Sequence, residues 1–298
     1  MLDVALVLAS SGCWFAGALL SASSRPPERL ATGLGLLGSL LALGAAIHLL
    51  LGGAASGLTF RVWGLPARLE LDALSAAFLL PLHLVGGLGL IYGQRYWPVQ
   101  TPWGSGRSLR FFYGLLVAAM TLLFIARHGL VFLVAWELMA VSAFFLVGTE
   151  HEKPEVRRAS WVYLACTHTG TLLLTAMVIL MAQRMGGLSW IALPTSTSPL
   201  FEGGILFLAL VGFGFKAGVL PLHFWLPSAH ASAPSHVSAI LSAVMLKTGI
   251  YGLLRVSSLL PDIPRGVGGT LLALGALTAV YGVGNALAQR DYKRLLAY

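Results

Sequence analysis

The sequence predicts an all-α protein that crosses a membrane about nine times, and three observations support this fold class. Of the 298 residues, 57% are hydrophobic and 10% are charged, which is too few polar side chains to cover a water-soluble fold. Mean hydropathy is +0.83. The apolar stretches are about 20 residues long, the length that a helix needs to cross the hydrocarbon core.

The predicted spans cover residues 2–20, 30–52, 71–93, 109–126, 130–148, 160–182, 203–220, 235–257 and 266–288. The first has no basic segment ahead of it and begins near Asp3, which is typical of a spanning helix and not of a removable leader. The two longest connections, 53–70 and 183–202, are rich in Gly, Pro, Ser and Thr and are predicted to be surface loops.

The distribution of positive charge predicts the orientation. Eleven of the 19 Lys and Arg residues lie in loops on one side and six on the other, and the remaining two are Lys216 and Lys247. The richer side is predicted to be cytoplasmic, with the N-terminus outside. The net charge of +8 is thinly spread, which argues against a nucleic-acid surface. Cys13 and Cys166 fall inside apolar segments and are interpreted as buried hydrophobes.

Residues 212–255 depart from the apolar pattern, because lysines, prolines and histidines interrupt them. A charge near the bilayer centre costs roughly 2.5–3.5 kcal/mol on insertion scales, so Lys216 and Lys247 indicate ion movement. Pro221 lacks an N–H and its ring opposes the Ala217 carbonyl, which predicts a helix break one turn after Lys216. Broken helices at membrane depth often line transport sites.

Glu137, in the middle of the fifth span, is the predicted partner of Lys216. Burial disfavours the ammonium form of that lysine and a carboxylate favours it, so a small movement switches its charge, as a proton relay requires. A pair of this kind also occurs as a purely structural clamp. Lys247 has no acid on its own helix, and this third charge favours a transport path.

The histidines are predicted to assist the relay or to cap and pack helices. His223, His230 and His236 flank the predicted break at spacings that fit no common zinc pattern, so no metal site is expected. His168, in the run CTHTGT, is a relay candidate or an interhelical hydrogen-bonding residue. No CxxC, cysteine cluster or GxGxxG occurs, so no cofactor or redox centre is expected in this chain.

These motifs carry a family resemblance. The run of residues 212–255, AWELMAVSAFFLVG at 135–148 and the terminal QRDYKRLLAY resemble the antiporter-like membrane subunits shared by respiratory complex I, Mrp antiporters and membrane-bound hydrogenases. The wording GFGFKAGVLPLHFWLPSAH and THTGT is most similar to the large antiporter-like subunit, component B, of hydrogenase 4 and formate hydrogenlyase. The specific match runs from residue 109 to the end.

The resemblance implies roles for individual residues. Glu137 matches the glutamate that modulates the charge on the seventh-helix lysine, here Lys216, and Lys247 matches the eighth-helix residue that links the uptake half-channel to the membrane centre. It also implies three parts: a three-helix region at 1–108, a five-helix antiporter-like unit with a broken helix at 109–257, and a ninth helix at 258–298. That last part would begin an inverted second unit, most of which is absent.

The sequence therefore predicts a proton-translocating subunit of a redox-driven complex in the inner membrane, of the hydrogenase-4 or NADH:quinone oxidoreductase type. Its expected partners are other membrane subunits that carry the electrons, the lipid bilayer and protons, and not nucleic acid. Two alternatives remain: an Mrp-type sodium/proton antiporter subunit and a truncated scaffold that transports nothing.

Overall fold

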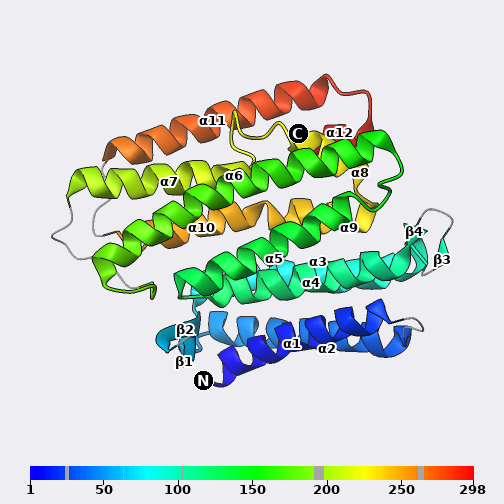
Figure 1. Cartoon of the computed structure of the whole chain (residues 1–298), viewed down its shortest axis with the longest axis horizontal. Coiled ribbons are helices and arrows are strands. Elements are labelled where there is room, and N and C mark those ends of the chain that lie inside the picture. Colours follow the sequence, from blue (N-terminus) through cyan, green and yellow to red (C-terminus); the bar gives the residue numbers. More distant parts are fainter. Residues whose placement is uncertain (24–26, 63, 99, 102–103, 191–197, 261–264) are drawn as a thin grey trace.

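The structure, a computed structural model, describes residues 1–23, 27–62, 64–98, 100–101, 104–190, 198–260 and 265–298. Within these ranges nine helical segments are long and apolar enough to cross a membrane, as predicted. They lie side by side, with α1 and α2 at one edge of the bundle and α11 at the other (Figure 1). The long elements are α1 (Leu2–Ala22), α2 (Glu28–Leu50), α3 (Ala73–Tyr96), α4 (Gly106–Ile125), α5 (Gly129–Val147), α6 (Pro154–Met185), α7 (Pro199–Ala217) and α11 (Arg265–Leu287).

The eighth span is a composite. It consists of α9 (Ser235–Ile240), the π-helical turn η1 (Leu241–Met245) and α10 (Lys247–Ser257). The short helix α8 (Leu226–Ser232) precedes it, and α12 (Tyr292–Ala297) follows α11. A π-helical turn widens the helix by one residue and is frequent at functional sites.

Small residues bring the N-terminal helices together. A Cβ atom on Gly17 would lie 2.8 Å from the Ala31 carbonyl oxygen, so α1 and α2 can approach this closely only because glycine is present. At the start of α3, the side chain of Asp72 accepts a hydrogen bond from the Ser75 N–H at 2.9 Å and caps the helix.

The first predicted loop is wrong, because residues 53–70 contain most of a β-hairpin. Strands β1 (Ser56–Val62) and β2 (Leu65–Leu71) pair in antiparallel register. In β2 the buried residues Ala67, Leu69 and Leu71 alternate with outward-facing ones, a period-two pattern that the flanking Gly and Pro obscure in the sequence. In the second predicted loop, residues 191–197 lie outside the described residues. A second short pair, β3 (Gln100–Thr101) and β4 (Gly104–Ser105), precedes α4.

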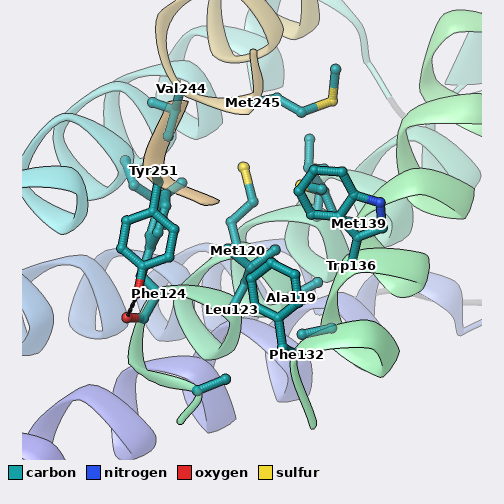
Figure 2. Packing of buried hydrophobic residues seen from close by; sticks show 14 of the residues in the cluster. Ala119, Met120, Leu123, Phe124, Phe132, Trp136, Met139, Val244, Met245 and Tyr251 are labelled. Carbon is teal, nitrogen blue, oxygen red and sulfur yellow. Dashed lines mark hydrogen bonds between the residues drawn. The ribbon is translucent and has the colours of Figure 1, made fainter. Parts of the chain in front are cut away.

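The core lies between α4, α5 and the eighth span. Figure 2 shows the side chain of Met120 between Phe124 and Tyr251 on one side and Trp136 and Met139 on the other, with Met245 above them. The Tyr251 hydroxyl donates a hydrogen bond to the Phe124 carbonyl oxygen at 2.6 Å. Methionine is unbranched and flexible, which suits it to packing among the aromatic rings of this core.

An ion cluster of Asp72, Arg127 and Arg255 ties the hairpin end of the bundle together; we call it the Asp72 cluster. Arg255 donates to both carboxylate oxygens of Asp72, at 2.7 and 2.9 Å, and Arg127 Nη2 lies 3.0 Å from Asp72 Oδ1. Burial alone would raise the pKa of Asp72, but the Arg255 hydrogen bonds and the Arg127 charge outweigh it and hold that pKa well below its usual range. The cluster thereby joins the start of α3 to the α4–α5 connection and to α10.

Candidate functional site

Glu137 and His168 meet across the interface of α5 and α6, near the middle of both helices. The distance from Glu137 Oε2 to His168 Nε2 is 3.5 Å, and the side chains are 33% and 50% exposed. The other oxygen, Glu137 Oε1, is buried and has no hydrogen-bond partner in the part of the chain that the structure describes. This carboxyl group is therefore incompletely satisfied.

His168 is held in place from both sides of its ring. Its Nδ1 atom lies 3.1 Å from the Leu164 carbonyl oxygen, which only accepts hydrogen bonds, so this contact requires a hydrogen on Nδ1. Its Nε2 atom faces Glu137 Oε2. The ring therefore presents one nitrogen to the backbone and the other to the carboxyl group.

Lys216 is the most completely buried cation of the site. Only 1% of the residue is exposed, and its Nζ atom donates a hydrogen bond to the Tyr163 hydroxyl at 2.8 Å. Nζ also lies 4.9 Å from the centre of the Tyr163 ring and 5.8 Å from that of Trp136. Two aromatic faces and a neutral hydroxyl thus surround this ammonium group.

The direct ion pair expected between Glu137 and Lys216 is not formed. Among the described residues no carboxylate is in salt-bridge contact with Lys216, and the partner of Glu137 is His168. Glu137 still acts electrostatically on both Lys216 and Tyr163. The physical reason is that Tyr163, on α6, takes the hydrogen-bonding position beside the ammonium group.

Tyr163 is the residue of this site that the sequence reasoning missed. It is fully buried, and its hydroxyl both accepts from Lys216 and points to Met245 Sδ at 3.8 Å. Trp225 covers it, with ring centres 5.1 Å apart. The chain has eight tyrosines, and a phenol within the predicted sixth span was the available signal, since a buried Tyr hydroxyl usually has a partner.

The helix break lies earlier than predicted and has another cause. Helix α7 ends at Ala217, and Gly218 adopts the left-handed conformation at φ 72°. The N–H groups of Gly218 and Val219 both bond to the Gly214 carbonyl oxygen, at 3.0 and 3.2 Å, which closes the helix end. Pro221 lies beyond this cap, so its ring does not end the helix.

Lys247 begins α10 directly after the π-helical turn. Its side chain is exposed on the surface of the chain, and Nζ donates a hydrogen bond to the Ser242 carbonyl oxygen. The bond from the Leu246 N–H to the Leu241 carbonyl skips one residue, which leaves the Ser242 carbonyl available to the ammonium group. Lys247 therefore does not join Lys216 in one buried cluster.

The three histidines near the helix break, His223, His230 and His236, lie in different surroundings. His230 is 2% exposed, contacts Ser238 Oγ at 3.0 Å through Nδ1, and lies within electrostatic range of Lys247. His223 packs against Tyr281 of α11, with ring centres 5.2 Å apart, and lines a cavity of about 390 Å³ beside the break. His236 instead lies among tyrosines of α3 and α4.

In the described ranges no group of three or more His, Cys, Asp or Glu side chains is placed to hold a metal ion. Cys13 and Cys166 are free thiols. Among the predicted site residues, the structure places Glu137 beside His168, and it places Lys216 beside Tyr163. His230 contacts Ser238 and Lys247 contacts the Ser242 carbonyl oxygen, so these two act on each other only electrostatically. This arrangement suits the movement of protons between neighbouring groups and offers few oxygen ligands for a hard cation.

Comparison with known proteins identifies the family. Residues 126–298 match the family described as NADH:quinone oxidoreductase/Mrp antiporter, TM. The chain belongs to this family. It is 37% identical to hydrogenase-4 component B of Escherichia coli (strain K12) over 77% of its own length and 34% of that protein. It is 32% identical to formate hydrogenlyase subunit 3 of the same strain, over 99% of this chain and 47% of the relative.

A solved structure agrees with this membership. The Mrp complex from Dietzia sp. DQ12-45-1b contains a chain that superposes on this one with a TM-score of 0.83 at 28% identity, covering 100% of this chain and 32% of that one. This chain thus spans between about a third and a half of the length of the relatives that it matches. Membership confirms the resemblance found in the sequence and the multi-pass helical membrane fold.

Proposed function

We propose that this chain moves protons across the inner membrane as one subunit of a redox-driven complex whose other subunits carry the electrons. The observation that carries the proposal is the environment of Lys216, a fully buried amine bonded to a neutral hydroxyl and within electrostatic range of Glu137. A buried charge without direct neutralisation is costly, so its protonation responds to small changes nearby.

Glu137 and His168 would set the charge of Lys216. When Glu137 is ionised, its field favours the ammonium form of Lys216. When a proton moves from His168 to Glu137, that field is lost and burial drives Lys216 to release its proton. Tyr163, whose hydroxyl accepts the hydrogen bond from Nζ, holds the amine in position. Its own hydroxyl hydrogen points to Met245 Sδ, which does not take up protons, so the released proton would leave through water.

Onward transfer would need water between the separate groups. His230 and Lys247 form one branch, while His223 and its cavity beside α11 form another. The cavity of about 390 Å³ has room for about 13 waters at roughly 30 Å³ each. The five-helix unit at 109–257 would contain the relay, with region 1–108 packed beside it and 258–298 leading onward.

The names of these relatives support an assembly, because they denote a component, a subunit and a chain of a complex. By analogy, this chain would assemble with other membrane subunits. The excess of Lys and Arg residues in the loops on one side supports an N-terminus outside. The match to the Mrp complex supports a second candidate function, a sodium/proton antiporter subunit. A sodium requirement for transport that persists across pH would favour that second function.

The test is proton flux by the assembled complex in sealed vesicles. Glu137→Gln preserves shape but removes the charge, and flux should fall at least about tenfold, the effect of about 1.4 kcal/mol of lost coupling. Glu152→Gln, at an exposed position before α6, is the matched control and should change nothing. Unchanged flux in Glu137→Gln at normal complex levels would remove Glu137 from the mechanism.

A further inference from the structure

A groove of about 450 Å³ opens on the outer surface of α4, α5 and α6, apart from the relay. It lies where α5 ends and α6 begins, beside the first turn of α4, at the end of the bundle opposite the β1–β2 hairpin (Figure 1). Its apolar walls are formed by Leu109, Phe144, Phe145, Gly148 and Trp161, and its polar rim by Ser108, Thr149, His151, Arg157 and Ser160.

The walls are a fixed aromatic surface. Phe145 stacks on Phe112 with ring centres 4.2 Å apart and an interplanar angle of 12°, and Phe144 meets Trp161 edge-on at 5.3 Å. Phe145 and Trp161 are nevertheless 45% and 58% exposed. The rings therefore hold one another in place while presenting apolar area outwards, where a spanning helix meets acyl chains.

The rim is cationic at one end. Arg157 lies in the first turn of α6, at the level where the α5 span has ended, and its Nη1 atom donates to the His151 carbonyl oxygen at 3.2 Å. Among the described residues no carboxylate pairs with Arg157, so its remaining N–H donors are available. The groove thus combines a guanidinium group at the level of the membrane surface, where lipid head groups lie, with an aromatic channel deeper in the membrane.

We infer that this groove binds an anionic glycerophospholipid, with the phosphate at Arg157 and His151 and an acyl chain along Phe145 and Trp161. Its volume lies within the roughly 300–1,000 Å³ of small-ligand sites. The excess of positive charge in the loops on this side of the membrane complements an anionic head group.

The test is native mass spectrometry of the purified chain, titrated with phosphatidylglycerol and with phosphatidylcholine of identical acyl chains. The wild-type protein should prefer the anionic lipid. Arg157→Gln should weaken phosphatidylglycerol binding about fivefold, the factor expected for one basic side chain at an anionic surface, and leave phosphatidylcholine unchanged. Arg158→Gln is the matched control, because it removes the same charge from the next residue of α6, outside the groove lining.

A second variant tests the channel. Trp161→Ala should weaken both lipids, since it removes apolar wall and no charge; because Trp161 is largely exposed, folding should survive. Equal losses in Arg157→Gln and Arg158→Gln would mean diffuse surface attraction and overturn the site. So would a photocrosslinker at Phe145 that captures a neighbouring subunit and no lipid in the assembled complex.

Discussion

The Asp72 cluster and the Lys216 site both remove charge from solvent, but they satisfy it in opposite ways. Asp72 receives two guanidinium groups, with contacts of 2.7 to 3.0 Å. Lys216 is bonded to a phenol, and Glu137 acts on it only from a distance. Close bidentate pairs hold their protonation states fixed, whereas an amine with a neutral partner is free to change its own. The contrast favours a structural role for the Asp72 cluster and supports the proposed transport role of the Lys216 site.

The largest effect on stability is expected in the Asp72 cluster. Asp72→Asn leaves two buried guanidinium groups without their carboxylate and should lower the free energy of unfolding by about 2–3 kcal/mol, after allowance for the partial exposure of Asp72. Thermal unfolding in detergent measures this loss. Proton flux per folded complex should remain within about twofold of the wild-type value; a selective collapse of flux would break the comparison.

Tyr163→Phe should lower proton flux while leaving thermal stability nearly unchanged, the reverse of the result expected for Asp72→Asn. It removes the hydroxyl that accepts the Lys216 hydrogen bond but keeps the ring that packs against Trp225. A hydrogen bond to a charged group contributes roughly 1.5–3 kcal/mol, so the altered protonation of Lys216 should lower proton flux at least about tenfold. The midpoint of thermal unfolding should move little. Normal flux in this variant would show that the phenol only fills space.

His168→Gln should have a smaller effect that depends on pH. Glutamine can still hydrogen-bond to Glu137, but it cannot take up and release a proton. We expect flux to fall about threefold and its dependence on pH to flatten, because glutamine does not titrate. His48→Gln on α2, which contacts Asp3 at 3.2 Å, is the control. An unaltered pH profile in His168→Gln would exclude His168 from the relay.

The smallest effect concerns acid stability. The folded-state pKa of Asp72 is below its ordinary value, so the unfolded chain takes up this proton first as pH falls. The contribution of Asp72 is therefore fully present above about pH 4 and is lost progressively at lower pH. In Asp72→Asn, the decline of unfolding temperature below about pH 4 should be shallower than in the wild type. Equal slopes would mean that other carboxylates dominate.

The sequence predicted the features that depend on run length and on rare charges. Nine spans follow from apolar runs, and Glu137 and Lys216 were identified as unusual because ionisable groups are costly at membrane depth. The features that it did not predict depend on backbone geometry and contacts. The left-handed Gly218 ends α7, although proline is the more conspicuous helix breaker.

Contacts between helices were the other limit. The sequence suggested that opposite charges on α5 and α7 would meet, but the intervening Tyr163 on α6 occupies the contact to Lys216. The π-helical turn before Lys247 is a change in hydrogen-bond register that leaves no pattern in the residues themselves. The alternation in β2 was readable, yet nearby Gly and Pro favoured a loop.

The central claim is that Lys216 must release its proton during transport, and Lys216→Arg tests it most directly. Arginine keeps the positive charge but hardly ever deprotonates, so flux in sealed vesicles containing the assembled complex should fall to background. Lys216→Met, which removes the charge at similar length, controls for packing and should also be inactive while folding as well as the wild type. Near-normal flux in Lys216→Arg, in a complex of normal abundance and thermal stability, would contradict the account.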